Sequence, residues 1–395
     1  MTAQKPDCTG SGIYLSQMVS ALDRAGHEQA VICGIAGTEE FEVAPGVQMF
    51  PVRFETEQLP FSVCGMSDVM PYKATRYRDL TPEMGSQFED AFSGVVDKAY
   101  QEFRPDLVIC NHLYFLTAIV RERIKDVPVV GICHATCLRQ LATNPFQVER
   151  IMREIPRLDH IFALHEVQKQ AIVDRFGVDE GLVDVIGTGY DAEVFSRNDE
   201  IVRCDNPKRI VYAGKISNAK GVASLMRALR YLEVEPGSIE IRCIGGAGDV
   251  SEYEQIRRLS DLSPHPVLFL GRIPKEDLVE EYQRADAFVL PSFHEGLPLV
   301  TIEALACGCK VVCCDWPGVR SWMEGHLKNA PIRYVALPEG VLSDKACGSE
   351  QPAFERRLAR ALEDSLGAER VVCDMSDLTW DSLVRRLMGF LGFSL

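Results

Sequence analysis

The chain has 395 residues, of which 46% are hydrophobic and 25% are charged, as in globular proteins large enough for two domains. Its net charge of −15 argues against nonspecific binding to nucleic acid, which needs basic residues to neutralise phosphates. No apolar run reaches the ~18 residues of a membrane-spanning helix, and the first residues have no signal-peptide core. We therefore expect a cytoplasmic protein with no transmembrane segment and no nucleic-acid partner.

The chain contains fourteen cysteines, a number that raises the question of a metal site or of disulfides. Their spacings include no C-x2-C pair matched by a second pair, as a structural zinc site would need. Several cysteines lie in apolar, strand-like runs, where the thiol behaves as a small hydrophobic group. We expect reduced thiols in the core and no metal site.

Short apolar runs alternate with amphipathic stretches, which predicts an α/β protein with parallel sheets covered by helices on both faces. A polar, turn-rich stretch over 187–207 interrupts the alternation and predicts a domain boundary, with domains over 1–188 and 189–375 and a last segment over 376–395. The predicted strands are 30–34, 107–110, 129–133, 161–164, 183–186, 209–213, 239–244, 267–270, 287–290 and 310–314. The predicted helices are 13–25, 83–103, 167–176, 222–232, 276–285, 299–307 and 380–390.

Residues 291–312, PSFHEGLPLVTIEALACGCKVV, place two carboxylates around a helix start. Pro298 suits the first position of a helix, and the N–H groups that follow carry partial positive charge and bind anions. Glu295 precedes the helix and Glu303 lies about one turn into it, so both could hold one ligand, such as a diphosphate between two sugars. For Glu303 alone, a place on the helix surface is an equally good interpretation. The residues expected around the anion are Gly296, Leu297, Leu299 and Val300.

Three glycine-containing turns follow predicted strands in the second domain. In 209–229, RIVYAGKISNAKGVASLMRAL, Lys215 and Lys220 lie in one loop and could bracket a diphosphate, although loop lysines are more often simply solvated. The turn 244–248, IGGAG, allows the backbone to come close to a ligand at Gly246. The turn 271–274, GRIP, contains Ile273 and is as well explained as a plain strand-to-helix connection.

Two histidines in the first domain follow predicted strands. His112 comes after strand 107–110 and His134 after strand 129–133. Ligands of open α/β sheets bind beyond the carboxyl ends of the strands, which is where both side chains are expected. An isolated histidine at such a place more often has a structural role.

Together these segments resemble the retaining nucleotide-sugar glycosyltransferases of family four (glycosyl transferases group 1). Segment 291–312 fits PS-x-x-EG-x-P-hydrophobic-x-x-x-EA-x-A-x-G at nearly every position. Segment 214–221 is similar to G-R-L-x-x-x-K-G, with Lys215 in place of the usual arginine, which keeps the charge but loses the bidentate fork. Segment 8–28, CTGSGIYLSQMVSALDRAGHE, resembles the family's glycine-rich loop and first helix.

The resemblance implies a GT-B architecture, with two Rossmann-like doubly wound domains facing across a cleft and a final helix that packs back on the first. It implies transfer of a hexosyl group from a nucleoside-diphosphate sugar to an acceptor hydroxyl, with retention and without a metal or other cofactor. The catalytic residues would be His134, near the reacting sugar, and Glu295, on the sugar's hydroxyls. The donor-binding residues would be Gly12, Lys215, Lys220, Gly246, Ile273, Gly296, Leu297, Leu299, Val300 and Glu303, the last of these on the ribose.

The acceptor is left open among a sugar, a sugar phosphate and a lipid-linked sugar, as are the base and sugar of the donor. Segment 54–81 has little periodicity and would either receive an acidic acceptor or form a solvated excursion. Its aromatic and cationic residues are Tyr72, Lys73, Arg76, Tyr77 and Arg78.

One departure from the family concerns the start of the first domain. The family has a buried strand before the glycine-rich loop, whereas here only MTAQKPDC precedes it. Our hypothesis is that this sequence lacks its first strand, because translation starts upstream of Met1 or because the domain is incomplete. Two alternatives remain: a nucleotide-sugar epimerase of the same fold, and a degenerate transferase that only binds nucleotide sugars.

Overall fold

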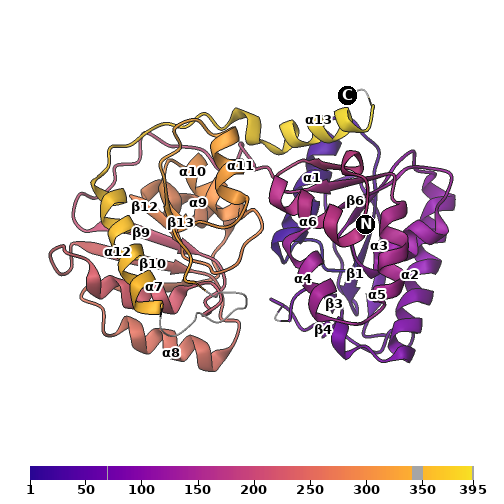
Figure 1. Cartoon of the computed structure of the whole chain (residues 1–395), viewed down its shortest axis with the longest axis horizontal. Coiled ribbons are helices and arrows are strands. Elements are labelled where there is room, and N and C mark those ends of the chain that lie inside the picture. Colours follow the sequence, from indigo (N-terminus) through magenta and orange to yellow (C-terminus); the bar gives the residue numbers. More distant parts are fainter. Residues whose placement is uncertain (69, 340–349, 394–395) are drawn as a thin grey trace. The chain divides into compact units, whose positions relative to one another are not determined.

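The computed structural model describes residues 1–68, 70–339 and 350–393. The chain divides into two compact units; in Figure 1 the N-terminal unit runs from indigo to magenta and also contains the yellow last helix, α13. The N-terminal unit comprises Met1–Gly189 and Trp380–Leu395, and the C-terminal unit comprises Tyr190–Thr379. The chain thus passes between the units after residues 189 and 379, where the sequence predicts boundaries after 188 and 375. Both units are α/β, as predicted.

The N-terminal unit contains two parallel sheets, one of β1 and β2 and one in the order β5-β6-β7-β8, and a two-residue pair β3-β4. Its strands are β1 (Ala30–Ala36), β2 (Gln48–Phe54), β3 (Cys64–Gly65), β4 (Thr75–Arg76), β5 (Val108–Asn111), β6 (Val129–Ile132), β7 (His160–Ala163) and β8 (Val183–Val185). Its helices are α1 (Gly10–Arg24), α2 (Pro82–Phe103), α3 (Phe115–Arg123), α4 (Ala135–Thr143), α5 (Val148–Glu154), α6 (Glu166–Phe176) and α13 (Trp380–Phe390).

The first residues of the chain lie between β1 and β5. Met1 donates from its amine to Ile109 O at 2.6 Å and accepts from Asn111 N at 2.8 Å. Thr2 N donates to Ile32 O at 3.0 Å, and the side chain of Ala3 is buried in the core. No β-strand precedes α1 among the residues described. A short extended stretch therefore occupies part of the place where the family resemblance predicts a strand.

The last helix, α13, belongs to the N-terminal unit and packs on α1. The rings of Tyr14 and Trp380 meet edge to face at 5.0 Å, and Arg24 forms an ion pair with Asp381 at 2.6 Å. Arg386 donates to Ile186 O at 3.3 Å and ties the same helix to the end of β8.

The C-terminal unit has one parallel sheet in the order β11-β10-β9-β12-β13-β14, the 3-2-1-4-5-6 order of dinucleotide-binding folds. Its strands are β9 (Lys208–Ala213), β10 (Ile239–Ile244), β11 (Val267–Gly271), β12 (Ala287–Leu290), β13 (Lys310–Cys314) and β14 (Ile332–Val335). Its helices are α7 (Val222–Ala228), α8 (Val250–Ser260), α9 (Lys275–Arg284), α10 (Leu299–Ala306), α11 (Val319–His326) and α12 (Gln351–Gly367).

Most predicted elements lie within two or three residues of those found, and β10, β12 and β13 have the predicted bounds. The predicted helix 222–232 is too long, because α7 ends at Ala228 and a 3-10 turn, Leu229–Tyr231, follows. The sequence missed β2, in which buried positions alternate with partly exposed ones and which contains Pro51. It also missed the helices α3, α4, α5, α8, α11 and α12 and the strands β3, β4 and β14.

All described cysteines are free thiols, and most of them are buried, as the sequence predicts. Within the described residues, no helix combines the length and the apolar character that crossing a membrane requires.

Candidate functional site

The strand order of the C-terminal unit places its switch point between β9 and β12. In sheets of this kind, ligands bind where the connections from two adjacent strands run in opposite directions, outside the carboxyl ends. The loop after β9 (215–221) and the segment after β12 (291–298) meet there, and Phe293 N donates to Ala219 O at 3.0 Å. Gly221 has a φ of +69°, and a Cβ at this position would lie 2.0 Å from Pro291 O. Only glycine allows the two segments to pack this closely.

An ion pair joins these two segments. Lys220 Nζ lies 2.6 Å from Glu295 Oε1, with 32% and 13% of the two side chains exposed. The structure thus brings together a predicted phosphate-binding cation and the predicted sugar-binding carboxylate. A diphosphate sugar that binds here has to share or exchange this pair, because its phosphates attract the ammonium and its hydroxyls donate to the carboxylate.

Helix α10 begins immediately after this ion pair. Pro298 is the N-cap and Leu299 the first helical residue, so the prediction that Pro298 opens the helix is wrong by one position. No side chain caps the N-terminus, and the first turn contains no acidic residue. The N–H groups at Leu299 and Val300 therefore form a positive helix end without a competing carboxylate.

Glu303 lies on α10, about one turn beyond its start. Its side chain keeps a partly exposed edge, yet the surrounding protein desolvates the carboxyl and raises its pKa to about 7. The nearby Lys275 counteracts this rise and Asp191 adds to it, and these two residues form an ion pair at 3.8 Å. The sequence analysis missed Lys275, although it directly follows the turn 271–274, and Asp191, for which we find no local signal.

The glycine turn after β10 packs against the loop that contains Lys215. Gly214 N donates to Ile244 O at 2.9 Å, and Ile216 N donates to Gly246 O at 3.0 Å. Gly245 has a φ of +135°, and its Cβ would lie 1.9 Å from Gly214 O, so this contact also requires glycine. The buried Tyr212 holds the backbone of Lys215 in place, because its hydroxyl donates to Lys215 O at 2.6 Å.

The turn 271–274 approaches the glycine turn after β10 through the side chain of Arg272. A Cβ on Gly246 would lie 2.8 Å from Arg272 Nε, so this guanidinium lies over the glycine turn. The predicted donor-binding residues Gly246 and Ile273 are therefore on neighbouring loops. Arg272 is a further cation of this region that the sequence analysis did not single out, although it stands inside the GRIP motif.

In the N-terminal unit, His134 precedes α4 and is buried, with 7% of its surface exposed. Its Nε2 lies 3.0 Å from Asn111 Oδ1, and its ring packs edge to face on Tyr14 at 5.1 Å. Burial, and to a smaller extent the nearby His112, hold its pKa well below the usual value. His134 is thus a neutral ring whose orientation Asn111 fixes. Neither Asn111 nor Tyr14 was identified from sequence.

His112 lies beside His134, with ring centroids 4.8 Å apart. It has a φ of +79°, and its Nε2 contacts Gln4 Nε2 at 2.8 Å and Ser11 Oγ at 3.1 Å. Its Nδ1 lies 3.4 Å from Cys137 Sγ. With both ring nitrogens occupied, His112 joins the first residues of the chain to the helix that follows β6.

Gly12 lies in the first turn of α1, next to these residues. Thr9 caps the helix by accepting from Gly12 N at 3.0 Å. A Cβ on Gly12 would lie 2.9 Å from Lys5 O, so the glycine lets residues 5–7 pass closely over the helix start. The contact between Ser11 and His112 places this glycine-rich loop at the carboxyl end of β5.

The three cations predicted to form a patch in segment 54–81 each pair with an acidic residue, so the described part of this segment has no free cationic patch. Lys73 pairs with Glu55 at 3.4 Å and Arg76 with Asp79 at 2.6 Å, and Arg78 pairs with Asp68. The other two residues of the predicted patch are aromatic: Tyr77 is buried in the hydrophobic core, and Tyr72 lies under the ammonium of Lys5 at 5.2 Å. These contacts do not favour an acceptor site. The segment is not a solvated excursion either, because Leu59, Val63 and Cys64 are fully buried in the hydrophobic core.

Comparison with protein families identifies two successive matches. Residues 9–194 match the model described as Glycosyltransferase Family 4, and residues 207–340 match Glycosyl transferases group 1. The chain belongs to the group 1 glycosyltransferases. The family recognised from the motifs in 291–312 and 214–221 is thereby confirmed.

Relatives of this glycosyltransferase match along most of its length. An uncharacterised glycosyltransferase of Methanocaldococcus jannaschii is 26% identical, over 84% of this chain and 83% of the relative. The D-inositol 3-phosphate glycosyltransferase of Mycolicibacterium smegmatis is 26% identical, over 79% of this chain and 72% of the relative.

Solved structures share the fold at low sequence identity. Sucrose-phosphate synthase from Thermosynechococcus elongatus superposes with a TM-score of 0.66 at 17% identity, covering 99% of this chain and 97% of the other. An Anabaena protein in complex with UDP and glucose has a TM-score of 0.64 at 14% identity, covering 99% and 98%. These similarities confirm the predicted GT-B fold class.

Proposed function

We propose that this glycosyltransferase moves a hexosyl group from a nucleoside-diphosphate sugar to an acceptor hydroxyl, with retention at the anomeric carbon and without a metal ion. The observation that carries the proposal is the Lys220–Glu295 pair at the switch point of the C-terminal sheet, directly before the uncapped start of α10. A cation, a carboxylate and a positive helix end in one place match a ligand that carries both phosphates and hydroxyls.

In this proposal the chemical task is to stabilise the charge that develops on the departing diphosphate. Lys220, Lys215 and the N–H groups at Leu299 and Val300 supply positive charge that is fixed before the reaction, which is the most effective form of electrostatic stabilisation. In metal-dependent transferases a divalent cation stabilises this charge. Because the groups named here would do the same, we propose that no metal ion is needed.

The two carboxylates would bind two different parts of the donor. Glu295, held beside Lys220, would accept hydrogen bonds from the hydroxyls of the transferred sugar. Glu303, one turn into α10, would accept from the ribose hydroxyls. The glycine turn at Gly246 and the turn at Ile273 would lie along the nucleoside. The Anabaena complex with UDP and glucose, which shares the fold, supports this class of donor.

In the N-terminal unit we assign His134 to the reacting sugar. Because its ring is neutral and Asn111 fixes its orientation, it suits a hydrogen bond to a sugar hydroxyl rather than a charge–charge contact. The glycine-rich loop with Gly12 would approach the donor's phosphates. The acceptor is a hydroxyl of a sugar, a sugar phosphate or a lipid-linked sugar. Retention rests on the family resemblance.

The decisive experiment has two stages. A thermal-shift panel with UDP, GDP and ADP identifies the base, because a bound ligand raises the free energy of unfolding by RT ln(1 + [L]/Kd). Sugars on that nucleotide are then incubated with the protein in the presence of EDTA, and products are followed by NMR. Slow donor hydrolysis, or transfer that preserves the anomeric configuration, supports the proposal. An epimerised donor, or binding without turnover of any donor, contradicts it.

Two matched variants test whether nucleotide binding and turnover take place at the proposed site. Glu303→Gln preserves size and removes the charge that would accept from ribose, so it should weaken nucleotide binding. Glu295→Gln should leave the affinity for the free nucleotide nearly unchanged and lower turnover, because the free nucleotide has no sugar to hold. If both variants keep wild-type kinetics, the assignment of the two carboxylates is wrong.

A further inference from the structure

Two thiols lie on either side of His134 in the sequence of the N-terminal unit. Cys133 directly follows β6, and Cys137 is the third residue of α4, four positions further along the chain. Both side chains are fully buried. Between them, His134 is the N-cap residue of α4. The function proposed above uses His134 but neither cysteine, so these two thiols lie at the candidate site without an assigned role.

The two sulfurs contact the two ends of the His134 backbone. His134 N donates to Cys137 Sγ at 3.3 Å, and Cys133 Sγ donates to His134 O at 3.7 Å. The Cys133 thiol is also within hydrogen-bonding reach of Cys137, whose sulfur is the acceptor of that contact. The two sulfurs are therefore close enough to react with each other, and a covalent change at either one alters a contact of His134.

Hydrogen-bond donors surround the sulfur of Cys137. Besides His134 N, the ring atom His112 Nδ1 lies 3.4 Å from it, and the backbone of Leu113 donates to it. The sulfur also lies at the first turn of α4, where the helix end stabilises negative charge. Burial opposes ionisation of this thiol, but the contacts with Cys133, His112 and Leu113 outweigh it and hold the pKa of Cys137 well below the usual value.

Other buried thiols of the chain lack this arrangement. Burial raises the pKa of Cys110 in β5, and it raises the pKa of Cys243 in β10 to about 12. Burial and the hydrogen bond to Cys137 likewise raise the pKa of Cys133. Because the thiolate is the form that reacts with oxidants, Cys137 is the expected point of attack. Cys133 is then the thiol in position to attack the oxidised sulfur.

We propose that Cys133 and Cys137 form a reversible disulfide on reaction with hydrogen peroxide, and that this disulfide displaces His134. In the first step the Cys137 thiolate attacks one peroxide oxygen. The S–O bond of a sulfenic acid forms, the O–O bond breaks, and the hydroxide that leaves takes up the proton lost by Cys137 and becomes water.

In the second step the sulfur of Cys133 attacks the sulfur of Cys137. The S–S bond forms and the S–O bond breaks, and the hydroxide that leaves takes the proton of Cys133 as a second molecule of water. The two sulfurs together lose two electrons, which the peroxide gains. A dithiol reductant reverses the reaction by thiol–disulfide exchange.

The disulfide removes contacts that hold His134 in the reduced protein. Cys133 loses the S–H group that donates to His134 O, and Cys137 loses the negative charge that makes its sulfur a good acceptor for His134 N and His112 Nδ1. Since the function proposed above assigns His134 to the reacting sugar, this part of the inference rests on that function: oxidation should lower turnover and a reductant should restore it.

The test uses the full chain and follows the thiols by mass spectrometry. Trypsin releases both cysteines in one peptide, residues 126–139, which contains no methionine. Protein treated with peroxide is denatured, alkylated and digested. The disulfide then appears as peptide 126–139 with two hydrogens fewer and no alkyl group. Peptide 243–257 contains Cys243 alone and serves as the reference for a buried thiol without this arrangement.

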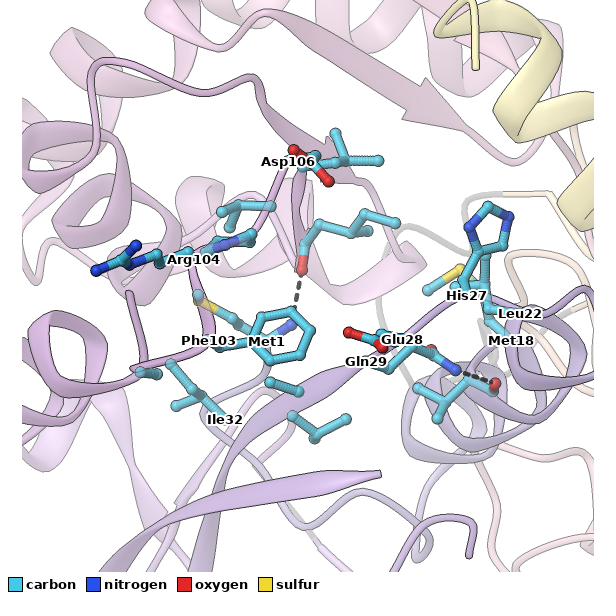
Figure 2. A pocket seen from close by; sticks show the side chains of 18 of the residues that line it. Met1, Met18, Leu22, His27, Glu28, Gln29, Ile32, Phe103, Arg104 and Asp106 are labelled. Atoms are coloured by element: carbon cyan, nitrogen blue, oxygen red, sulfur yellow. Dashed lines mark hydrogen bonds between the residues drawn. The ribbon is translucent and has the colours of Figure 1, made fainter. Parts of the chain in front are cut away.

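A methionine of the same unit reports whether the oxidant has entered it. Buried groups meet peroxide only when the surrounding structure opens locally. Figure 2 shows Met18 beside a cavity of about 450 Å³ in the N-terminal unit. Oxidation of Met18 to the sulfoxide adds one oxygen, which tandem mass spectrometry locates. The peroxide dose is raised until this product is seen.

We expect the disulfide in peptide 126–139 to form at least about tenfold faster than Cys243 is oxidised, because Cys137 reacts as the thiolate. A fully alkylated peptide 126–139 at a dose that oxidises Met18 overturns the proposal. Oxygen added to Cys137 without loss of hydrogens overturns it too, since Cys133 would then be out of reach. Equal oxidation of Cys243 contradicts the special reactivity of the pair.

Variants separate the two thiols. In Cys133→Ala, peptide 126–139 should gain oxygen at Cys137 instead of losing hydrogens, and in Cys137→Ala the remaining Cys133 should stay alkylatable. Cys243→Ala makes the same truncation in the C-terminal unit and should leave formation of the disulfide unchanged. A disulfide signal that persists in either variant of the pair would show that another cysteine is the partner.

Turnover tests the link to His134 separately from the chemistry of the thiols. Donor turnover should fall as peptide 126–139 is oxidised and should return with dithiothreitol, while the Kd for the free nucleotide stays unchanged. Oxidation with unaltered turnover would contradict the displacement of His134. If no donor is turned over even by the reduced protein, the proposed function fails, but the mass measurement still decides whether the disulfide forms.

Discussion

The two units build the same kind of parallel sheet but differ at its centre. In the C-terminal unit the central strand, β9, has six residues and pairs with β10 on one side and β12 on the other. In the N-terminal unit the equivalent place, between β1 and β5, contains only the first residues of the chain, with three backbone hydrogen bonds. One sheet is continuous through its switch point, and the other is divided there.

This difference affects how firmly the candidate ligand-binding loop of each unit is held. The loop with Lys215 and Lys220 follows a strand that is hydrogen-bonded to a neighbour on each side. Gly214, Gly221 and Gly245 allow this loop to pack closely against its neighbours. The loop with Gly12 follows only a short extended stretch at the start of the chain. Its position depends on contacts among side chains, such as those of His112 with Gln4 and Ser11. A strand anchors a ligand-binding loop through the backbone, whereas side-chain contacts must do so where the strand is short.

The largest effect is expected from the ion pair of the C-terminal unit. Lys220→Ala should lower turnover about 10²–10³-fold, the cost of losing one preorganised charge at a developing anion. Lys220→Arg, which keeps the charge, is the matched control and should retain most of the activity. Steady-state kinetics with the donor found in the panel measure both. Near-normal turnover in Lys220→Ala would remove Lys220 from the proposed site.

The second prediction separates the two units functionally. His134→Gln should lower turnover roughly 10²-fold, the loss expected when a reacting group is no longer well positioned. Its Kd for the free nucleotide should stay within about twofold of wild type, because all proposed nucleotide contacts other than the Gly12 loop are in the C-terminal unit. Glutamine can still donate to Asn111 Oδ1, which limits the structural change. Calorimetric titration measures the Kd, and a large change in it would contradict the proposed division.

The third prediction compares one glycine from each sheet. A Cβ at Gly221 would lie 2.0 Å from Pro291 O, and one at Gly34 would lie 2.3 Å from Ala3 O. Gly221→Ala also imposes a positive φ on alanine, so we expect a loss of about 1–3 kcal/mol from backbone strain with the clash in addition. Gly34→Ala should cost less, roughly 1 kcal/mol, because the first residues of the chain can move away.

Urea unfolding measures both variants in this comparison. Equal losses of stability would mean that the first residues of the chain are held as firmly as the loop after β9. That result would contradict the contrast drawn between the two sheets.

The smallest effect concerns the pH dependence of nucleotide binding. Burial raises the pKa of Glu303 from 4.5 to about 7, so the carboxyl is largely protonated below pH 7. A protonated carboxyl accepts poorly from ribose, and the affinity should fall by at most about tenfold per pH unit below pH 7. The dependence should disappear in Glu303→Gln. Titrations between pH 5.5 and 8.5 test it, and an affinity that rises with acidity would contradict the ribose assignment.

The same pKa shift has a consequence for stability with the opposite sign. The unfolded chain loses the Glu303 proton near pH 4.5, whereas the folded protein holds it until about pH 7. Between these values the folded state binds more protons, so this group makes the free energy of unfolding fall as pH rises. Glu303→Gln should therefore gain stability relative to wild type as pH rises through this window.

Much of the site was predictable because its residues lie close together in sequence. Glu295, the start of α10 and Glu303 belong to one strand–helix unit, and Lys215 and Lys220 belong to another. Glycines and a proline mark the turns in both. The residues that were missed act through space. Asn111 orients His134 from another strand end, and Asp191 approaches Glu303 from more than one hundred residues away in the chain.

The sequence by itself determined the α/β class, the position of most strands and the family, because apolar periodicity and turn residues act locally and the motifs are contiguous. Only the tertiary structure decided that Lys220 pairs with Glu295, that burial holds His134 neutral, and that the cations of segment 54–81 pair with nearby acidic residues. It also decided what lies between β1 and β5. Such outcomes depend on which groups a fold brings within a few ångströms, and no local pattern contains that information.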